Sequence, residues 1–303
     1  MRIGIDLGGT KTEAILITPE GEEVTRLRTK TPAEDYPANL DMLVSLVTRL
    51  DEMAGRTCPV GIGMPGAISP ATSLVKNSNS TWLIGEPVAQ HLEARLGPRL
   101  RFANDADCFA LSEASDGAAA GYKTVFGVIL GTGVGGGLVV NGQLVEGPNA
   151  ISGEWGHTPL PWMQADEFPG PQCYCGKHGC IEAWCSGPAL AADHTRETGH
   201  SLAPEDIVAA AEGGHEAAKA TLDRHTDRLA RALSTVINII DPHAIVLGGG
   251  LSDLDHIYPQ VAQRLPRYVF SDTVVTPILK NKHGASSGVR GAAWLWPADK
   301  VLM

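Results

Sequence analysis

Three of the six cysteines lie within eight positions of the chain, as Cys173, Cys175 and Cys180. Their spacing, C-x-C-x4-C, differs from the two CxxC knuckles of a zinc ribbon. Thiolates bind zinc, and three of them need one more ligand to complete a tetrahedral site. His157, in the segment GEWGH, can supply that ligand from sixteen residues before Cys173. These four side chains predict one structural Zn²⁺.

The predicted zinc-binding loop covers residues 157–180. Between its ends it contains four prolines and no evident core, so a metal ion would fix a segment that is otherwise mobile. Gly176 and Gly179 permit the tight turn that a metal knuckle needs. Incidental thiols and a redox dithiol are alternatives, but a dithiol leaves the third cysteine and the histidine unexplained. The other cysteines lack partners at ligand spacing, and we expect them to be buried apolar groups: Cys58, Cys108 and Cys185.

A second set of chemical groups surrounds a Gly-Gly pair near the N-terminus. In the segment DLGGTKT, residues 6–12, glycines at a hairpin tip let backbone N–H groups face an anion. The threonines add hydroxyl donors, the lysine adds positive charge, and the aspartate can hold the hydrated Mg²⁺ that accompanies nucleotide phosphates. An ordinary glycine-rich hairpin with a solvated aspartate is the alternative. The candidate nucleotide and magnesium residues of this turn are Asp6, Gly8, Gly9, Thr10, Lys11 and Thr12.

Two further glycine-rich turns strengthen this interpretation. LGTGVGGG, residues 130–137, contains the spacing GxGxxG, but that dinucleotide fingerprint requires a helix after the glycines. The strand-like LVVNG follows instead, so we expect a second phosphate turn. The three glycines after the apolar AIVL would offer a flat backbone surface to a nucleoside. The candidate residues of these turns are Gly131, Thr132, Gly133, Gly248 and Gly249.

Hydrophobic periodicity predicts the elements that position these turns. β-branched runs at 2–7, 12–17 and 22–30 predict three strands joined by tight turns. Apolar residues at helical spacing predict a helix over 37–53, and a buried strand then runs into the turn of GMPG. The segment RLRFANDADC predicts a strand that ends at Asn104-Asp105, followed by an alanine-rich helix.

The same order of elements then recurs, which predicts a duplicated α/β domain. A hairpin around the second turn occupies 124–144, and a long amphipathic helix covers 215–240. We place the boundary near 118–123, which gives an N-terminal domain of residues 1–118 and a C-terminal domain of residues 119–285, with a cleft between them. The segment SSGVRGAAWLW predicts a helix within residues 286–303 that packs back on the first domain.

Composition argues against several classes of partner. The net charge of −10 disfavours a polyanion such as nucleic acid. No segment approaches the roughly 18 to 20 apolar residues of a membrane span, and the first residues lack the apolar run of a secretory signal. We therefore expect a cytoplasmic protein without a membrane partner.

Seven motifs, in order and over the whole chain, resemble those of ROK family sugar kinases of the actin-like ATPase superfamily. They are DLGGTKT, GMPG, NDAD, LGTGVGGG, GEWGH, CYCGKHGCIE and IVLGGG. The resemblance implies two actin-like, ribonuclease H-like domains, with ATP phosphates between the two glycine-rich turns and a sugar in the interdomain cleft. It also implies Mg²⁺ with the ATP, structural zinc and a homodimer.

Phosphoryl transfer to a sugar needs positioning, charge stabilisation and one carboxylate near the attacking hydroxyl. The family pattern places this catalytic base on Asp105, in NDAD. Two alternatives remain from the residues alone. Asp105 could instead cap the following helix, and Asp107 is a rival for the base.

The resemblance also implies a ring of polar sugar contacts, since an unpaired buried hydroxyl is unfavourable. The candidate substrate residues are Gly66, Asn79, Asn104, Asp105, Glu154, His157 and Glu182. Trp82 has two interpretations: it lies at the sugar end of the cleft, or it packs in the hydrophobic core. If one ring nitrogen of His157 binds zinc, the other could face a sugar hydroxyl directly.

The activity that we expect is ATP-dependent phosphorylation of a hexose at its 6-hydroxyl. KNSNSTWL, GEWGHTPLPWM and SSGVRGAAWLWP are most similar to bacterial fructokinases that also accept mannose, which predicts fructose as the substrate and mannose as a second one. A glucokinase or an N-acetylhexosamine kinase of the same family is the alternative. A sugar-sensing regulator is a rival from another class, but we expect no helix-turn-helix ahead of Asp6. A catalytically inactive sugar-binding protein would not need Asp105.

Overall fold

Two five-stranded sheets with the same pattern of strands form the framework of the protein. The computed structural model describes residues 1–297. The first sheet has the order β3 (Glu23–Lys30), β2 (Lys11–Ile17), β1 (Arg2–Leu7), β4 (Val60–Met64), β7 (Leu100–Asn104). The second has the order β10 (Gln143–Leu144), β9 (Val134–Val140), β8 (Thr124–Leu130), β11 (Ala244–Gly248), β12 (Ile278–Lys280). Each sheet joins antiparallel strands on one side to parallel strands on the other, which confirms the duplicated α/β fold.

The first three strands follow the predicted hairpins closely. β1 pairs antiparallel with β2, from Arg2 opposite Ile17 to Leu7 opposite Thr12. β2 then pairs antiparallel with β3. Since the first hairpin closes at Leu7 and Thr12, the Gly-Gly pair lies at its tip, where the sequence predicted it.

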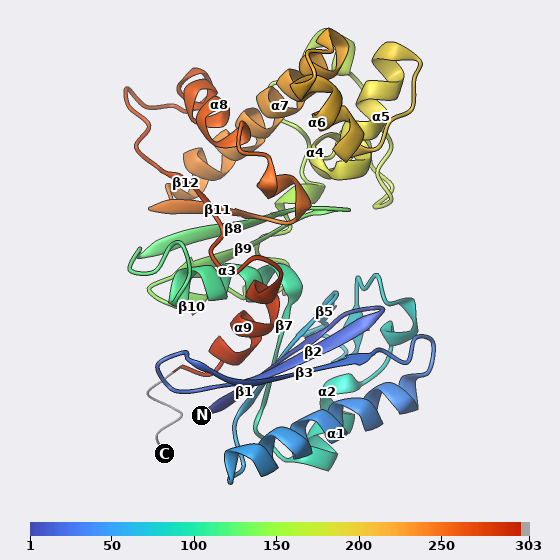
Figure 1. The fold of residues 1–303 in the computed structure, drawn as a ribbon, viewed down its shortest axis with the longest axis vertical. Coiled ribbons are helices and arrows are strands. Elements are labelled where there is room, and N and C mark those ends of the chain that lie inside the picture. The colour runs from blue at the N-terminus through green and yellow to red at the C-terminus, as the bar shows by residue number, and fades with distance from the viewer. Residues whose placement is uncertain (298–303) are drawn as a thin grey trace. The chain divides into compact units, whose positions relative to one another are not determined.

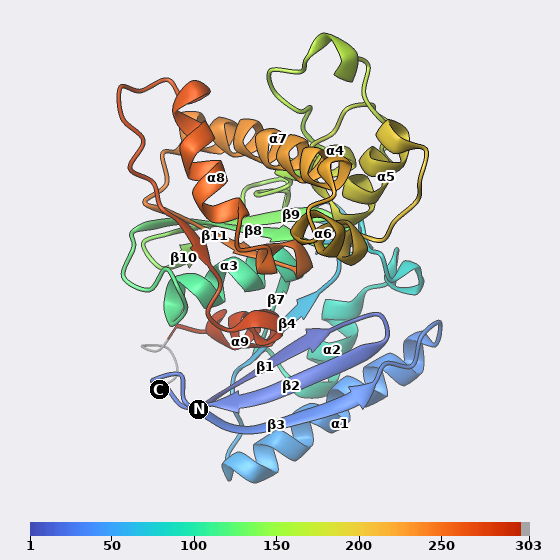
Figure 2. The ribbon, with the colours of Figure 1, turned by 45° about the horizontal axis from the view of Figure 1, so that its top comes forward.

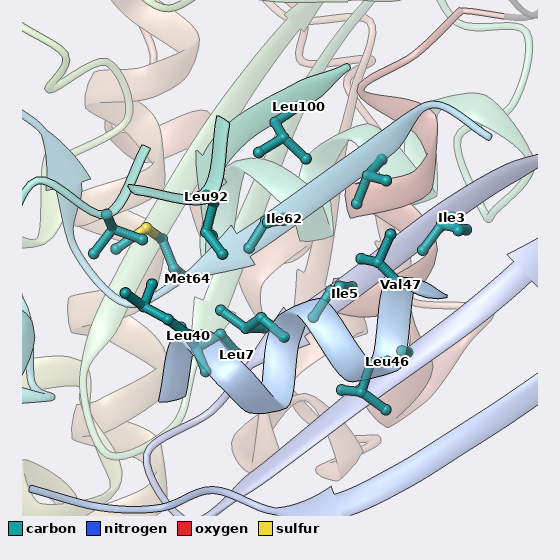
Figure 3. Close-up of a cluster of buried hydrophobic side chains, with 14 of the residues drawn as sticks. Ile3, Ile5, Leu7, Leu40, Leu46, Val47, Ile62, Met64, Leu92 and Leu100 are labelled. Atoms are coloured by element: carbon teal, nitrogen blue, oxygen red, sulfur yellow. The ribbon is translucent and has the colours of Figure 1, made fainter. Parts of the chain in front are cut away.

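One face of the first sheet packs against α1 (Tyr36–Ala54) and α2 (Val88–Leu96). The N-cap Asp35 accepts a hydrogen bond from the N–H of Ala38 at 3.0 Å, and α1 ends at Gly55, whose φ is 65°. Figure 3 shows the α1 side chains Leu46 and Val47 beside Ile3 and Ile5 of β1. This core holds the strand ends that carry the first turn.

The opposite face packs against α9 (Ser287–Trp294), which also contacts α3 (Asp105–Ser115). The contact is close: a Cβ on Gly4 would lie 2.2 Å from the carbonyl oxygen of Val289. The buried carboxylate of Glu113 in α3 accepts hydrogen bonds from Ser287 Oγ at 2.8 Å and from the N–H of Lys282 at 3.0 Å. The helix predicted within 286–303 therefore packs on the first sheet, although residues 298–303 of that prediction lie outside the described residues.

Helices that the sequence analysis mostly did not anticipate surround the long helix of the second half. They are α4 (Glu182–Cys185), α5 (Gly187–Thr198), α6 (Pro204–Glu212) and α8 (Ile257–Arg264), all in contact with α7 (Glu216–Ile240). Figures 1 and 2 show α7 running among them. The predicted helix at 215–240 agrees with α7 to within one residue. None of the helices within residues 1–297 combines the length and apolarity that a membrane span requires.

The chain divides into two compact units that do not follow a single boundary. One unit contains residues 1–121, 137–152 and the chain from 282 onward, and the other contains 122–136 and 153–281. Residues 137–152 were predicted in the second domain but belong to the first unit. Two contacts explain this: a Cβ on Gly137 would lie 2.8 Å from the carbonyl oxygen of Ala106, and Lys76 Nζ donates to the carbonyl of Asn149 at 2.7 Å.

Candidate functional site

Asp105 lies at the junction of β7 and α3, in the first unit. Asn104 caps α3, because its Oδ1 accepts a hydrogen bond from the N–H of Asp107 at 2.6 Å. Asp105 therefore does not serve as the N-cap, and its carboxylate, which accepts from the N–H of Ala106 at 2.9 Å, remains open to solvent. Partial enclosure by the protein still raises the pKa of this carboxyl, although hydrogen bonds from backbone N–H groups oppose the rise. A raised pKa suits a group that accepts a proton.

Asp6 lies at the end of β1, close enough to Asp105 for their charges to interact. Burial, and next the negative charge of Asp105, raise the pKa of Asp6 to about 6, while Lys11 acts in the opposite direction. A Cβ on Gly288 would lie only 3.1 Å from Asp6 Oδ2, so this glycine of α9 leaves room for the carboxylate. Gly288 was not predicted, because nothing in SSGVRG indicates which strand end it approaches.

The first glycine-rich turn exposes only part of the predicted set. Gly9, Thr10 and Lys11 are exposed, with Lys11 Nζ 3.6 Å from Glu13 Oε2. Thr12 is a correction: its side chain is buried, and its hydroxyl lies 2.8 Å from that of Thr31.

Thr12 therefore braces the turn instead of offering a hydroxyl to a phosphate. Its partner Thr31 donates to the carbonyl of Gly8 at 2.7 Å, which holds the turn in place. Side chains two positions apart share a face of a strand, so Thr12 lies on the same face of β2 as the core residues Ala14 and Leu16.

The other candidates of the first unit flank these groups. Gly66, at the end of GMPG, has a φ of 82°, and a Cβ there would lie 2.4 Å from the carbonyl of Lys76, so only glycine fits. This turn leads into the short strands β5 (Ala67–Ile68) and β6 (Val75–Lys76). Asn79 is exposed. Trp82 packs against the core of the first sheet, which agrees with the core-packing interpretation of this residue.

The second glycine-rich turn, in the second unit, closes on itself and on Glu182. The N–H of Gly131 donates to the carbonyl of Gly133 at 2.9 Å, and Glu182 Oε2 accepts from the N–H of Val134 at 2.9 Å. β9 begins at Val134 and contains Gly136, the last glycine of GxGxxG, so this turn leads into a strand and is no dinucleotide fingerprint. Glu182 therefore touches the predicted phosphate turn as well as being a predicted sugar contact.

A cavity of about 590 Å³ opens beside this turn. Its walls include Gly131, Thr132, Gly187, Pro188, Pro204, Glu205, Val208, Gly250, Leu251 and Leu254. Gly248 is buried in β11, and a Cβ on Gly249 would lie 2.4 Å from the carbonyl oxygen of Leu130. Gly250 lines this cavity, and the two predicted glycines are not among its lining residues. The apolar walls come from α5, α6 and the loop after β11. The sequence connected this loop to the nucleoside, but it gave no sign that the two helices would contribute.

His157, Cys173, Cys175 and Cys180 come together as predicted. Their ligand atoms all lie within 4.8 Å of one another. His157 Nδ1 is 3.6 Å from Cys173 Sγ, and the sulfurs of Cys175 and Cys180 are 3.6 Å apart. Ligands at the corners of a zinc–thiolate tetrahedron lie roughly 3.8 Å apart, so the donor set fits a zinc ion in type, number and spacing.

The protein alone does not favour three thiolates in this cluster. Burial raises the pKa of Cys173 and raises that of Cys180 to about 12, whereas a hydrogen bond from the N–H of Lys177 lowers the pKa of Cys175. A divalent cation would supply the missing positive charge. The remaining cysteines, Cys58, Cys108 and Cys185, are buried, as predicted.

The loop that carries the cluster has an anchor that the sequence analysis missed. Glu167 is buried, and its carboxylate accepts hydrogen bonds from Arg228 Nε at 2.8 Å and from Arg231 Nη1 at 2.7 Å, both on α7. These hydrogen bonds hold the pKa of Glu167 at about 2 despite its burial. At the other end, Trp155 Nε1 donates to the carbonyl of Gly135 at 2.9 Å and ties GEWGH to β9. The ion pairs require an acid and two arginines more than sixty positions apart, so no local pattern reveals them.

Tyr174 is a second residue that the sequence analysis missed. Its hydroxyl lies 2.9 Å from His157 Nε2, and the two rings meet edge to face with centroids 5.1 Å apart. Partial burial of the hydroxyl, then the charges of Glu182 and Glu154, raise the pKa of Tyr174 to about 12. The phenol is therefore neutral near pH 7 and lies within electrostatic reach of the three predicted sugar contacts of this unit.

Comparisons with known proteins agree over nearly the whole length. The model of the ROK family matches residues 2–299. The chain is 40% identical over 304 residues to an N-acetyl-D-glucosamine kinase of Yersinia pseudotuberculosis, which covers 99% of this chain and 100% of that protein. A ROK hexokinase from Thermus thermophilus has a TM-score of 0.86 at 26% identity, with 97% of each chain covered. A ROK family glucokinase from Streptomyces griseus, solved with glucose and AMPPNP, has a TM-score of 0.74 at 25% identity, covering 96% of this chain and 97% of that one.

Proposed function

The chain belongs to the ROK family, and we propose that it transfers the γ-phosphoryl group of ATP to the 6-hydroxyl of a hexose, with N-acetyl-D-glucosamine as its preferred sugar. The observation that carries this proposal is the 40% identity, over the full length of both chains, to a kinase of that sugar. Asp105 adds support, because it stands at a strand end with an accessible carboxylate of raised pKa.

Asp105 is the proposed general base. As the sugar hydroxyl attacks the γ-phosphorus, its proton passes to a carboxylate oxygen of Asp105. The group must be ionised to accept the proton, and a pKa above the usual value makes it a better acceptor. Asn104 fixes the start of α3 and with it the position of the neighbouring base.

Each of the two glycine-rich turns is proposed to bind ATP phosphates, and the cavity beside Gly131 is the proposed nucleoside site. Asp6 would hold the Mg²⁺ that accompanies ATP. The fit rests on its carboxylate, whose pKa is raised by burial and by Asp105, since such a pair gains from a divalent cation. When bound, Mg²⁺ neutralises charge that develops on the phosphates.

His157, Cys173, Cys175 and Cys180 would hold a structural Zn²⁺, which their mutual spacing supports. The zinc takes no part in phosphoryl transfer. Its effect is to join the predicted sugar contacts Glu154 and His157 to the far end of their loop, beside Glu182.

The choice of sugar rests on the relatives. The prediction of fructose has no support among them, whereas their name favours the N-acetylhexosamine alternative. A coupled assay of ADP release with N-acetylglucosamine, glucose, mannose and fructose tests the proposal. We expect the highest kcat/KM with N-acetylglucosamine. A higher value with fructose would restore the first prediction, and ADP release with none of the four would refute a hexose kinase.

A homodimer and the absence of nucleic-acid binding stay predictions. Light scattering of the purified protein tests the first. Retention on immobilised DNA at low salt tests the second, and the net charge of −10 predicts no retention.

A further inference from the structure

Tyr174 occupies a position that the chemistry of the site assigns to a substrate hydroxyl. It lies between two of the clustered cysteines, and 79% of its surface is exposed. It is therefore no core residue. Its hydroxyl nevertheless has a defined partner, since it lies 2.9 Å from His157 Nε2.

The two nitrogens of His157 face different partners. Nδ1 faces the thiol cluster, 3.6 Å from Cys173 Sγ, which leaves Nε2 as the nitrogen directed away from the sulfurs. With Nδ1 on a metal ion, Nε2 carries the ring proton and donates to an oxygen acceptor. Tyr174 supplies that oxygen here, where the sequence analysis expected a sugar hydroxyl.

The geometry of the contact supports the comparison with a sugar hydroxyl. The Tyr174 hydroxyl lies 2.9 Å from His157 Nε2, and the two rings meet edge to face with centroids 5.1 Å apart. A phenolic hydroxyl can donate one hydrogen bond and accept another, as a sugar hydroxyl can.

We propose that Tyr174 is a displaceable cover of the sugar site, whose hydroxyl holds His157 Nε2 when sugar is absent and leaves it when sugar binds. This inference rests on the proposed function, because it takes His157 as a sugar contact. Only molecules with Tyr174 displaced are competent to bind, so the cover lowers the apparent sugar affinity by the fraction of open molecules. The exposure of the ring means that it can swing into solvent without breaking a packed core.

A fixed orienting partner for His157 is the rival role, since metal-bound histidines commonly donate their second N–H to a neighbouring group. The two roles predict opposite changes in sugar affinity when the Tyr174 hydroxyl is removed. Removing a displaceable cover strengthens sugar binding and leaves zinc content unchanged. Removing a fixed partner loosens His157, which weakens sugar binding and zinc retention together.

The test compares Tyr174→Phe with Tyr122→Phe in the full-length, zinc-loaded protein. Both changes remove one phenolic hydroxyl from a partly exposed tyrosine of the same unit, and Tyr122 is 40% exposed and is none of the candidate residues. Calorimetry without ATP measures the Kd for N-acetylglucosamine, stopped-flow tryptophan fluorescence measures the association rate, and elemental analysis measures zinc.

We expect Tyr174→Phe to lower the Kd about three- to tenfold, the range that one hydrogen bond supports, with faster association and unchanged zinc. Tyr122→Phe should match the wild type. An unchanged or higher Kd in Tyr174→Phe would overturn the inference and leave the proposed function standing. If the wild-type protein binds none of the four sugars, the proposed function fails and the inference fails with it.

Discussion

Glu182 Oε2 accepts a hydrogen bond from the backbone N–H of Val134 at 2.9 Å. The contact joins the segment that follows the thiol cluster to the second glycine-rich turn. It also explains why position 133 is a glycine, because a Cβ there would lie 2.6 Å from the same carboxylate oxygen. One carboxylate thus braces the proposed phosphate turn and serves as a proposed sugar contact.

Because Glu182 has two proposed contacts, removing its charge should change the affinity for sugar more than the affinity for nucleotide. Glu182→Gln keeps an oxygen that accepts from the N–H of Val134, so the Kd for AMPPNP should stay near that of the wild type. Loss of the charge should raise the Kd for sugar about tenfold or more. Calorimetric titration with each ligand measures both, with exposed Glu93→Gln as the control. If the amide variant keeps full sugar affinity, Glu182 is no sugar contact.

Asp105→Asn removes the proposed base without changing its shape. We expect kcat to fall about 10²- to 10⁴-fold, with the sugar Kd nearly unchanged, since the amide still forms hydrogen bonds. Steady-state kinetics and calorimetry give the two values. Asp107→Asn is the matched control and should keep most of the activity. A kcat of about a tenth of wild type or more in Asp105→Asn would place the base elsewhere.

The raised pKa of Asp6 predicts that the protein loses stability as the pH rises through the range in which this group ionises. Its pKa is about 6 in the folded protein, above the value of about 3.9 expected in the unfolded chain. The folded state therefore binds more protons between these values, and the free energy of unfolding contributed by this group falls as pH rises from about 4 to about 6.

Replacing Asp6 with asparagine should remove this loss of stability. Well above pH 6 the Asp6→Asn variant should be more stable than the wild type by about 3 kcal/mol, and the difference should become small near pH 4. Urea denaturation at several pH values measures it. Equal stability of the two proteins at every pH would show that Asp6 ionises in the folded protein as it does in water.

Cys175→Ser tests the metal cluster. The purified wild-type protein should contain one zinc per chain, and the variant should lose zinc and sugar affinity while its affinity for AMPPNP changes less. The hydrophobic core of the first sheet contains no residue of this loop, and the ion pairs of Glu167 with α7 do not need the metal, so the variant should remain folded. Cys58→Ala, which removes a buried thiol outside the cluster, should keep its zinc. Wild-type protein purified without chelator that contains well under one zinc per chain would refute the site.

Local patterns predicted the framework and the gathering of the zinc ligands. The hairpins around the glycine-rich turns follow from β-branched runs bounded by glycine, and α7 follows from its amphipathic period. The four metal ligands could be grouped by residue type, because three thiols need one further ligand to complete a tetrahedral zinc site and a nearby histidine can supply it.

Other parts depend on contacts between distant segments and were not predictable in this way. Thr12 was assigned to phosphate because it follows a glycine turn, but the pairing of β2 with β3 places it beside Thr31. Glu167 resembles a solvated surface acid until α7 brings two arginines to it. Tyr174 resembles a spacer between cysteines until the loop folds back on His157.

The central claim is that phosphate moves from ATP to the 6-hydroxyl of a hexose, and the phosphorus NMR spectrum of the product tests it most directly. With ATP, Mg²⁺ and N-acetylglucosamine, we expect a new sugar-phosphate signal split into a triplet by the two protons on C6, and no such signal with Asp105→Asn. A doublet would place the phosphate on a carbon that bears one proton. Consumption of ATP that yields only inorganic phosphate, with this sugar and with glucose, mannose and fructose, would contradict the account.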